Sequence, residues 1–408
     1  MSVTSLPRRS VNVLLLENIH ATAGAVFEAE GFKVERISGA LKEPELVDRL
    51  QGVHFLGIRS KTRIHTSTLA KAEQLLAVGA FCIGTNQVDL VGTNAMGIPV
   101  FNAPFSNTRS VAEMIIGEIV FLARQMGDRS REVHEGKWRK VSNGCVEVRG
   151  KTLGIVGYGH IGSQVGVLAE SMGMRVISYD VRSTMAIGNA HAVDTLEELT
   201  ANADFVTLHV PETPLTRHMI GTKELAGMKA GSYLLNASRG TVVDIQALAD
   251  AVRSKHLAGA AIDVYPEEPE TNSDGFESPL RGLPNVILTP HVGGSTEEAQ
   301  AAIGKEVSVA LSRYFAQGAT VGAVNFPQAE LALPKETHRI LNVHKNVPGV
   351  LSEINRIVSE RNANIRGQLL ATDSEIGYLL MDLDDNVVRE VSADIAELGT
   401  SLKTRILT

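Results

Sequence analysis

Residues 151–180 read KTLGIVGYGHIGSQVGVLAESMGMRVISYD. The apolar run LGIV leads into Gly157, Gly159 and Gly162 in the spacing GxGxxG, followed by a helical pattern and a second apolar run, RVIS. A strand, a glycine turn and a helix in this order predict a doubly wound parallel sheet that binds a dinucleotide. The first glycine permits the tight turn, the second lets backbone amides approach a pyrophosphate, and the third lets the helix pack on the strand.

The strand after this helix ends in Asp180, 18 residues beyond Gly162. A carboxylate at this place accepts hydrogen bonds from the ribose hydroxyls of the adenosine, and it repels a 2′-phosphate. We therefore expect NAD as the cofactor. Arg182 follows two positions later, which leaves some tolerance of NADP open.

Working outward from this motif, we expect two α/β domains. Short apolar runs alternate with helical stretches from Val11 to about Pro104 and again from Lys151 onward, the pattern of parallel sheets with helical crossovers. We place the two domains at residues 1–107 and 108–295. Ser295 and Glu298 have the spacing of a capping box and open a last helix to about Gln317. We expect residues 296–330 to return to the first domain and complete it, because that domain has few helices of its own.

The pattern changes after the proline-containing link VNFPQAELALP. Residues 337–408 predict a strand, a helix, two strands, a helix and a strand, which is the βαββαβ order of a small ferredoxin-like domain. The predicted fold is therefore α/β, with two doubly wound parallel-sheet domains and a third, ferredoxin-like domain. Topology alone leaves open that this third domain only mediates dimerisation.

Composition excludes several classes of protein. The formal net charge of the 408 residues is -7 and the pI is near 6.0, which disfavours nucleic acid or an anionic membrane as a partner. Cys82 and Cys145 are the two cysteines, and neither has the spacing of a zinc ligand set. We expect a cytoplasmic protein without a bound metal, a signal peptide or a membrane span.

Three segments follow predicted strands downstream of the glycine motif: NASRG at 236–240, DVYPEEP at 263–269 and TPH at 289–291. The carboxyl ends of parallel strands share one edge of a sheet, so these segments are predicted to meet beside the nicotinamide. His291 would accept the hydroxyl proton as a hydride leaves, and Glu268 would orient its imidazole. Arg239 would bind a substrate carboxylate with its planar guanidinium.

Each of these residues also has an ordinary structural explanation. Arg239 fits a surface ion pair, Glu268 a solvated turn and His291 a strand-end cap. Their occurrence at three successive strand ends after a dinucleotide motif favours the catalytic interpretation.

With these motifs the chain resembles the D-isomer-specific 2-hydroxyacid dehydrogenases, and within them the biosynthetic branch that carries an ACT domain. The likeness covers essentially the whole chain. It rests on GIRSKT (57–62), FCIGTNQVDL (81–90), FNAPFSNTRSVAE (101–113), GIVGYGHIG (154–162), LLNASRGTVVDI (234–245), AAIDVYPEEPETNSD (260–274), LTPHVGGSTEEAQ (288–300) and VNFP (324–327).

The resemblance implies a role for each matching position. Arg239, Glu268 and His291 match the catalytic residues of the family, and Asp263 would face the nicotinamide carboxamide. Arg59, Ser60 and Asn107 would contact the substrate. The remaining cofactor contacts would be His160, Ile161, Asp180, Ala237, Ser238, Gly293 and Gly294, besides the three glycines of the motif.

The same resemblance implies oxidation of D-3-phosphoglycerate to 3-phosphohydroxypyruvate, the first step of L-serine biosynthesis. Pairs of ACT domains would bind L-serine as an inhibitor through His344, Asn346 and Asn364, in a homo-oligomer expected to be a tetramer. Trp138 would pack against a neighbouring subunit or lie in the core. Two alternatives stay open: a dehydrogenase of another 2-hydroxy acid, such as 2-hydroxyglutarate, and a non-enzymatic NAD-sensing corepressor.

Overall fold

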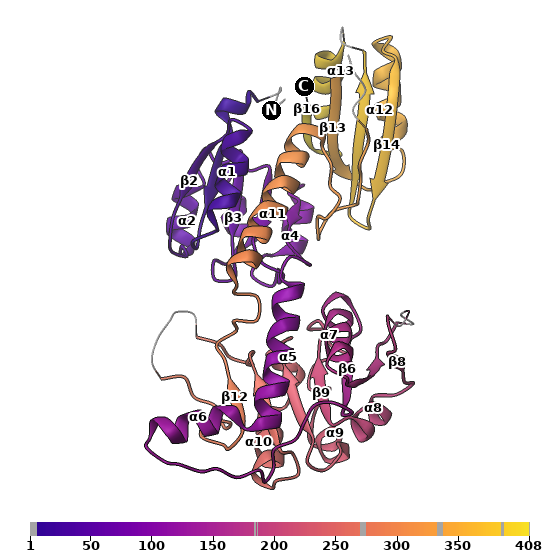
Figure 1. Cartoon of the computed structure of the whole chain (residues 1–408). Coiled ribbons are helices and arrows are strands. Elements are labelled where there is room, and N and C mark those ends of the chain that lie inside the picture. Colours follow the sequence, from indigo (N-terminus) through magenta and orange to yellow (C-terminus); the bar gives the residue numbers. More distant parts are fainter. Residues whose placement is uncertain are drawn as a thin grey trace. The chain divides into compact units, whose positions relative to one another are not determined.

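The computed structural model describes residues 6–182, 185, 187–269, 275–332, 338–384 and 387–407. The chain divides into two compact units, which are Met1–Ser106 with Gln300–Thr408, and Asn107–Ala299. Figure 1 shows that the first unit combines the indigo start of the chain with its orange and yellow end.

The seven-stranded sheet of the unit Asn107–Ala299 confirms the doubly wound sheet predicted around the glycine motif. Its strands are β6 (Thr152–Val156), β7 (Arg175–Tyr179), β8 (His191–Ala192), β9 (Phe205–Leu208), β10 (Tyr233–Asn236), β11 (Gly259–Ile262) and β12 (Val286–Leu288). All neighbours are parallel, in the order β12-β11-β10-β9-β6-β7-β8. The winding reverses between β6 and β9, and ligands of such sheets bind outside the carboxyl ends of the strands at this point.

The helices of this unit are α5 (Thr108–Arg124), α6 (Met126–His134), α7 (His160–Ser171), α8 (Leu196–Asn202), α9 (Thr222–Gly227) and α10 (Ile245–Arg253), with the 3-10 turn η2 (Gly240–Val242). The apolar pattern SVAEMIIGEIVFLARQM predicts one continuous helix from Ser110 to Met126. The structure ends α5 at Arg124, because Gln125 adopts a left-handed conformation with φ of 54° and breaks the helical hydrogen-bond pattern.

The first unit contains a five-stranded parallel sheet in the order β2-β1-β3-β4-β5. Its strands are β1 (Asn12–Leu15), β2 (Lys33–Arg36), β3 (Phe55–Ile58), β4 (Ala77–Ala80) and β5 (Val100–Phe101). The helical elements around them are η1 (Arg8–Ser10), α1 (Ala21–Ala29), α2 (Glu43–Arg49), α3 (Thr66–Leu69) and α4 (Leu90–Ala95). The winding of this sheet reverses between β1 and β3.

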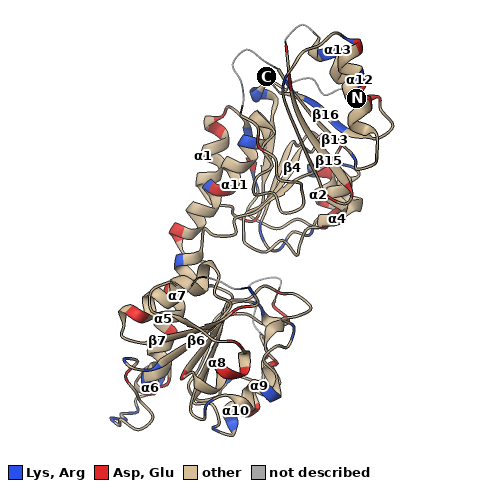
Figure 2. Cartoon of the chain, turned by 90° about the vertical axis from the view of Figure 1, so that its right-hand side faces the viewer, with Lys and Arg blue, Asp and Glu red and all other residues tan. Residues whose placement is uncertain are grey.

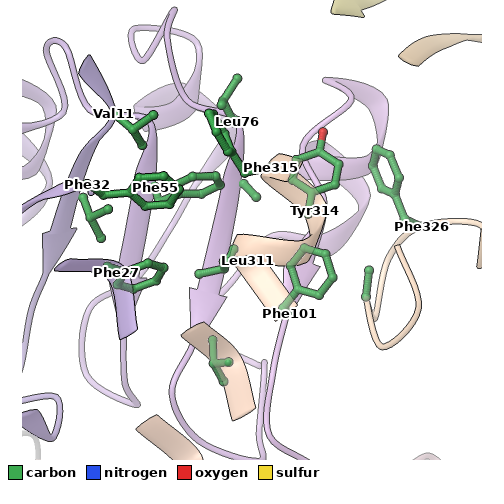
Figure 3. Close-up of a cluster of buried hydrophobic side chains, with 14 of the residues drawn as sticks. Val11, Phe27, Phe32, Phe55, Leu76, Phe101, Leu311, Tyr314, Phe315 and Phe326 are labelled. Carbon is green, nitrogen blue, oxygen red and sulfur yellow. The ribbon is translucent and has the colours of Figure 1, made fainter. Parts of the chain in front are cut away.

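Helix α11 (Glu297–Gln317) contributes to the core of this first sheet. A Cβ atom at Gly79 of β4 would lie 2.7 Å from Val307 and 2.9 Å from Leu311, so glycine is what lets the helix approach the strand. Figure 3 shows Leu311, Tyr314 and Phe315 of α11 beside the aromatic side chains of the sheet.

The cap predicted for this last helix differs in detail. The amide of Ala299 donates to Thr296 Oγ1 over 3.2 Å, so Thr296 rather than Ser295 supplies the capping oxygen. Helix α8 has a cap of the same kind, because the amide of Glu198 donates to Thr195 Oγ1 over 3.1 Å.

The C-terminal part has the predicted βαββαβ order. It consists of β13 (His338–Lys345), α12 (Val350–Glu360), β14 (Ile365–Thr372), β15 (Ile376–Leu383), α13 (Val388–Ala396) and β16 (Ser401–Leu407). The strands form an antiparallel sheet in the order β14-β15-β13-β16.

Both faces of this antiparallel sheet are covered. Alternate residues of a strand point to opposite faces. Ile340 and Leu379 pack with α12 and α13, whereas Leu341 and Tyr378 join the core that contains Tyr314 of α11. Tyr378 also donates its hydroxyl to the carbonyl of Gly318 over 2.5 Å.

A buried ion pair lies on the same side of the sheet. Arg339 donates to both carboxylate oxygens of Asp382 over 2.7 and 2.8 Å, and its guanidinium also donates to the carbonyls of Gln317, Leu331 and Ala332. Since Gln317 is the last residue of α11, Arg339 connects the antiparallel sheet to the end of that helix. Each of these contacts is a charge-assisted hydrogen bond, which is stronger than a neutral one.

Charges of both signs are interleaved along the described chain (Figure 2). Among the helices of the described residues, none has the length and apolar character needed to cross a membrane.

Candidate active site

The glycine loop lies between β6 and α7. Gly157 has φ of +90°, and a Cβ atom there would lie 2.4 Å from the carbonyl oxygen of His209. A Cβ atom at Gly162 would lie 2.2 Å from the carbonyl oxygen of Gly157, whereas nothing lies within 4 Å of one at Gly159. The outer two glycines are therefore required by packing, and the middle one leaves open space before the first turn of α7. Such a space fits the pyrophosphate of a dinucleotide.

Asp180 lies next to this loop at the end of β7. Its carboxylate accepts hydrogen bonds from the amides of Tyr158 over 2.8 Å and of Arg182 over 3.0 Å. The carboxylate is thus fixed between the glycine loop and the turn after β7, the place where it was predicted to meet the ribose. His160 and Ile161 open α7 beside it.

His291 and Glu268 form the expected pair. The Nδ1 atom of His291 lies 2.8 Å from Oε2 and 3.1 Å from Oε1 of Glu268, so the other ring nitrogen is left for a substrate. The amide of Tyr265 donates to the same carboxylate over 3.1 Å. The backbone of His291 is left-handed, with φ of 55°, and its amide donates to the carbonyl of Asp263 over 2.8 Å.

Electrostatic effects within this pair favour its charged form. The hydrogen bond that the imidazole donates to the carboxylate of Glu268 raises the pKa of His291 above its ordinary value, although burial opposes the shift. Burial alone would raise the pKa of Glu268, but the hydrogen bond and the charge of His291 bring it below its ordinary value. A histidine held in this way can both accept and return a proton near neutral pH.

Arg239 belongs to the same cluster. Its charge weakly opposes the rise in the pKa of His291 and adds to the lowering of the pKa of Glu268, so the structure brings the three predicted residues together. The side chain donates to the carbonyl of Ser238 over 2.6 Å, and Asn236 donates to the carbonyl of Arg239 over 3.0 Å. The loop after β10 therefore holds the guanidinium in a fixed place.

Asp263 organises the loop that carries His291. Its buried carboxylate accepts from Thr289 Oγ1 over 2.6 Å and from the amides of Val292 and Gly293, each over 2.8 Å. Three donors leave a carboxylate able to accept one more hydrogen bond, such as one from a carboxamide.

Two further predicted residues lie against this loop. Asn107 precedes α5 and is 9 % exposed, and its Oδ1 atom is buried without a hydrogen-bond partner among the described residues. A Cβ atom at Gly294 would lie 2.4 Å from Asn107 Nδ2, so glycine makes room for the amide. A buried acceptor without a donor is costly, which fits a site that a ligand completes.

Asn236 and Thr289 were not singled out from the sequence. Asn236 Oδ1 accepts from the amide and the hydroxyl of Ser238, and this fixes the chain at Ala237 and Ser238. Thr289 holds Asp263 in place. Both residues stand in the quoted motifs, one before ASRG and the other before PH, and their positions at strand ends are the signal that was available.

Arg59 and Ser60 lie in the other unit, in the loop that follows β3. Arg59 Nη1 is 3.5 Å from the carbonyl of Glu17, and Gln87 Nε2 donates to the carbonyl of Arg59 over 2.6 Å. Lys61 and Arg63 are exposed in the same segment, which concentrates positive charge there.

The residues predicted to bind serine are separated within one chain. Asn346 follows β13, and its Nδ2 donates to the carbonyl of Asp373 over 2.6 Å, whereas Asn364 precedes β14 and bonds to Asp384. Both strands are antiparallel to β15, with His338 and Ile365 each opposite Leu383. Asn346 and Asn364 therefore lie at opposite ends of the sheet, on the order of 20 Å apart.

His344 lies on the helical face of the same sheet. It is buried, which lowers its pKa, and its Nδ1 is 2.8 Å from Asn342 Oδ1. In a neutral imidazole bonded on one side, the other nitrogen can serve a ligand.

Trp138 is 84 % exposed, which excludes the core position that the sequence had left open. Among the described residues, no group of three or more histidine, cysteine, aspartate or glutamate side chains is placed to hold a metal ion.

Comparison with known proteins identifies the family. The NAD-binding domain of D-isomer specific 2-hydroxyacid dehydrogenases matches residues 116–293, and an ACT domain like that of the AHAS small subunit matches residues 340–403. The D-3-phosphoglycerate dehydrogenase of Dictyostelium discoideum is 53 % identical over 404 residues, covering 99 % of both chains. That of Escherichia coli K12 is 48 % identical over 410 residues and covers 100 % of both.

A solved structure agrees with this assignment. The D-lactate dehydrogenase of Aquifex aeolicus, in complex with NAD and lactic acid, superposes with a TM-score of 0.64 at 26 % identity and covers 74 % of this chain and 95 % of its own. The chain therefore belongs to the D-isomer-specific 2-hydroxyacid dehydrogenases, and it is an NAD-dependent enzyme of the branch that carries an ACT domain.

Proposed function

We propose that the chain oxidises D-3-phosphoglycerate to 3-phosphohydroxypyruvate, the first step of L-serine biosynthesis. The observation that carries this proposal is the pair of His291 and Glu268 with Arg239 beside it, next to a dinucleotide loop. The full-length relatives named D-3-phosphoglycerate dehydrogenase support the choice of substrate.

In this mechanism His291 removes the proton of the substrate hydroxyl through the nitrogen that does not face Glu268. Bound NAD supplies the hydride acceptor, held by the loop of Gly157, Gly159 and Gly162. Glu268 stabilises the imidazolium that forms, and Arg239 binds the substrate carboxylate and polarises the carbonyl that appears. In the reverse direction the imidazolium returns its proton to that carbonyl oxygen.

The other cofactor contacts keep their proposed roles: the carboxylate of Asp180 at the ribose, Asp263 at the carboxamide, and His160, Ile161, Ala237, Ser238, Gly293 and Gly294 around the dinucleotide. Asn107, Arg59 and Ser60 are proposed contacts of the substrate. The basic residues that accompany Arg59 suit a phosphate dianion.

The proposed division of labour follows the predicted boundaries. Residues 1–107, completed by 296–330, bind the substrate. Residues 108–295 bind NAD, and residues 337–408 form the regulatory ACT domain. The cytoplasm is the proposed compartment, in keeping with Cys82 and Cys145, which form no disulfide.

L-Serine is the proposed inhibitor, bound between two ACT domains. Asn346 and Asn364 lie at opposite ends of one sheet, so a site that uses both takes Asn346 from one chain and Asn364 from a second. The proposed assembly is a homotetramer, in which the exposed indole of Trp138 packs against another subunit.

The first experiment is the reduction of 3-phosphohydroxypyruvate by NADH with the purified chain, with and without L-serine. Fast turnover that serine suppresses is the expected result. Turnover of another 2-oxo acid in preference, such as 2-oxoglutarate, would replace the proposed substrate. NADH binding without any turnover would favour the corepressor alternative.

A mixing experiment tests the shared serine site. Asn346→Ala and Asn364→Ala chains should each lose serine inhibition, with IC50 raised roughly tenfold or more by the loss of one hydrogen bond to a charged ligand. A hybrid of the two variants places both changes in one site and leaves the other intact, so half of the serine binding should return. No recovery in the hybrid would contradict a site shared between chains.

A further inference from the structure

The loop that follows β3 is held by a carboxylate to which the proposed mechanism gives no role. Glu17, just after β1, is 7 % exposed. Its Oε1 accepts from the amide of Thr62 over 2.8 Å and its Oε2 from the amide of Lys61 over 3.0 Å. Both carboxylate oxygens of Glu17 are thus used on consecutive amides of one loop.

The backbone at Glu17 is itself unusual. Glu17 and Asn18 have φ of 60° and 51°, the left-handed region that non-glycine residues seldom adopt. The amide of Glu17 donates to the carbonyl of Gly39 over 3.1 Å, which helps to hold this conformation. Backbone strain of this kind is costly and persists mainly where function depends on the geometry.

The position of this contact in the sheet points to a ligand. In the order β2-β1-β3-β4-β5 the winding reverses between β1 and β3, and sheets of this order bind ligands outside the carboxyl ends of those two strands. Glu17 follows β1, and the amides that it binds follow β3. The contact therefore bridges the two strand ends at the reversal.

A second anchor holds the start of the same loop. Gln87 donates to the carbonyl of Arg59 over 2.6 Å, and Glu17 binds the amides of Lys61 and Thr62. Ser60 is exposed between these two fixed points. Preorganisation of this kind lowers the entropy cost of binding, because the loop need not be ordered by the ligand.

We propose that Glu17 is a positioning residue for a small substrate that carries a carboxylate and a phosphate. It acts through the loop of Arg59 and Ser60, so it affects the capture of the substrate more than the chemical step. The negative charge of Glu17 would repel an anionic substrate, so Glu17 acts by fixing the backbone of the loop and not by contacting the substrate. This inference rests on the proposed function.

The test compares Glu17→Gln with Glu43→Gln, a matched control. Glu43 also accepts two hydrogen bonds in the same unit, but its donors are Ser67 and Thr68 around α3 and not the loop. In Glu17→Gln one acceptor remains, while the new NH2 group faces an amide that can only donate. Steady-state kinetics with 3-phosphohydroxypyruvate, NADH binding by fluorescence and thermal melting are measured for both variants.

Glu17→Gln is expected to raise KM for the 2-oxo acid roughly ten- to a hundredfold, the loss of one hydrogen bond to a charged group. Its kcat should change by less than about threefold, because the groups that transfer the proton are untouched. The Kd for NADH should match the wild-type value, and Glu43→Gln should match the wild type throughout. Glu17→Asp, which keeps the charge, should fall between wild type and Glu17→Gln in KM.

Equal KM values in Glu17→Gln and Glu43→Gln would overturn the inference, as would a loss confined to kcat. If Glu17→Gln does not fold, Gln87→Ala releases the other anchor of the loop, and the same rise in KM is required of it. A wild-type chain that prefers another 2-oxo acid would overturn the proposed substrate instead, and the comparison of KM values is then made with that acid.

Discussion

The two parallel sheets hold their loops at the reversal of winding by opposite means. After β6 the loop consists of Gly157, the buried Tyr158 and Gly159, and Gly157 has no space for a side chain because the carbonyl of His209 lies 2.4 Å from the Cβ position. After β3 the loop is rich in charged side chains and is fixed by Glu17 and Gln87. A pyrophosphate is bound by bare backbone amides, whereas a small anion needs charged side chains on a backbone that does not move.

The largest effect on activity is expected at the carboxyl edge of the seven-stranded sheet, where His291 is the proposed general acid–base. His291→Asn should lower kcat roughly 10²- to 10⁴-fold, the usual contribution of a general acid–base, while NADH binding persists. His218→Asn is the matched control, because His218 is an exposed histidine of the same unit with a left-handed φ of 51°. Comparable losses in both variants, measured by steady-state kinetics, would show that His291 only shapes its loop.

A smaller effect separates packing from ligand binding in the glycine loop. Gly157→Ala should lower both the melting temperature and NADH affinity, since a positive φ and the close carbonyl together cost a few kcal/mol, about a hundredfold in an equilibrium constant. Gly159→Ala should keep the melting temperature and weaken only NADH binding, because its Cβ atom meets open space. Calorimetry and fluorescence titration distinguish the two, and equal melting losses would refute the distinction.

The smallest effect is a displacement of the pH profile. His291 must be protonated to reduce a 2-oxo acid, so the rate falls as pH rises through its pKa, which Glu268 raises. Glu268→Gln removes that carboxylate and should move the alkaline limb of kcat/KM to lower pH. Glu267→Gln, at the neighbouring position, should leave the alkaline limb of the kcat/KM profile unchanged. An alkaline limb that also stays unchanged in Glu268→Gln would contradict the pairing of His291 with Glu268.

Much of the catalytic unit was predictable because its signals are local. The strand, the glycine turn and the helix follow one another directly in residues 151–180. Because the carboxyl ends of parallel strands share one edge of a sheet, the sequence also predicts that Arg239, Glu268 and His291 lie close together. The NAD cofactor, the two doubly wound sheets and the βαββαβ order are confirmed by the structure and the family matches.

Other features needed three-dimensional contacts. Nothing in the local pattern indicates that the chain turns left-handed at Gln125, because no glycine or asparagine marks the break. Thr296 rather than Ser295 caps α11, since either side chain can reach an amide three residues on. The sequence carries no local signal for the role of Glu17, because its two amide partners lie more than 40 residues away in the chain.

The sequence by itself determined most of the elements, their order, the nucleotide motif and the residues that we propose for catalysis, because periodicity and short motifs are properties of neighbouring residues. Only the tertiary structure decided which distant groups share a hydrogen bond. The tertiary structure brings the carboxylate of Glu17 into hydrogen bonds with the loop of Arg59, and it packs α11 on the second face of the ACT sheet. It also separates Asn346 from Asn364 by the length of a strand. Such pairings depend on the close packing of whole elements, and that packing is set by every layer of the core at once.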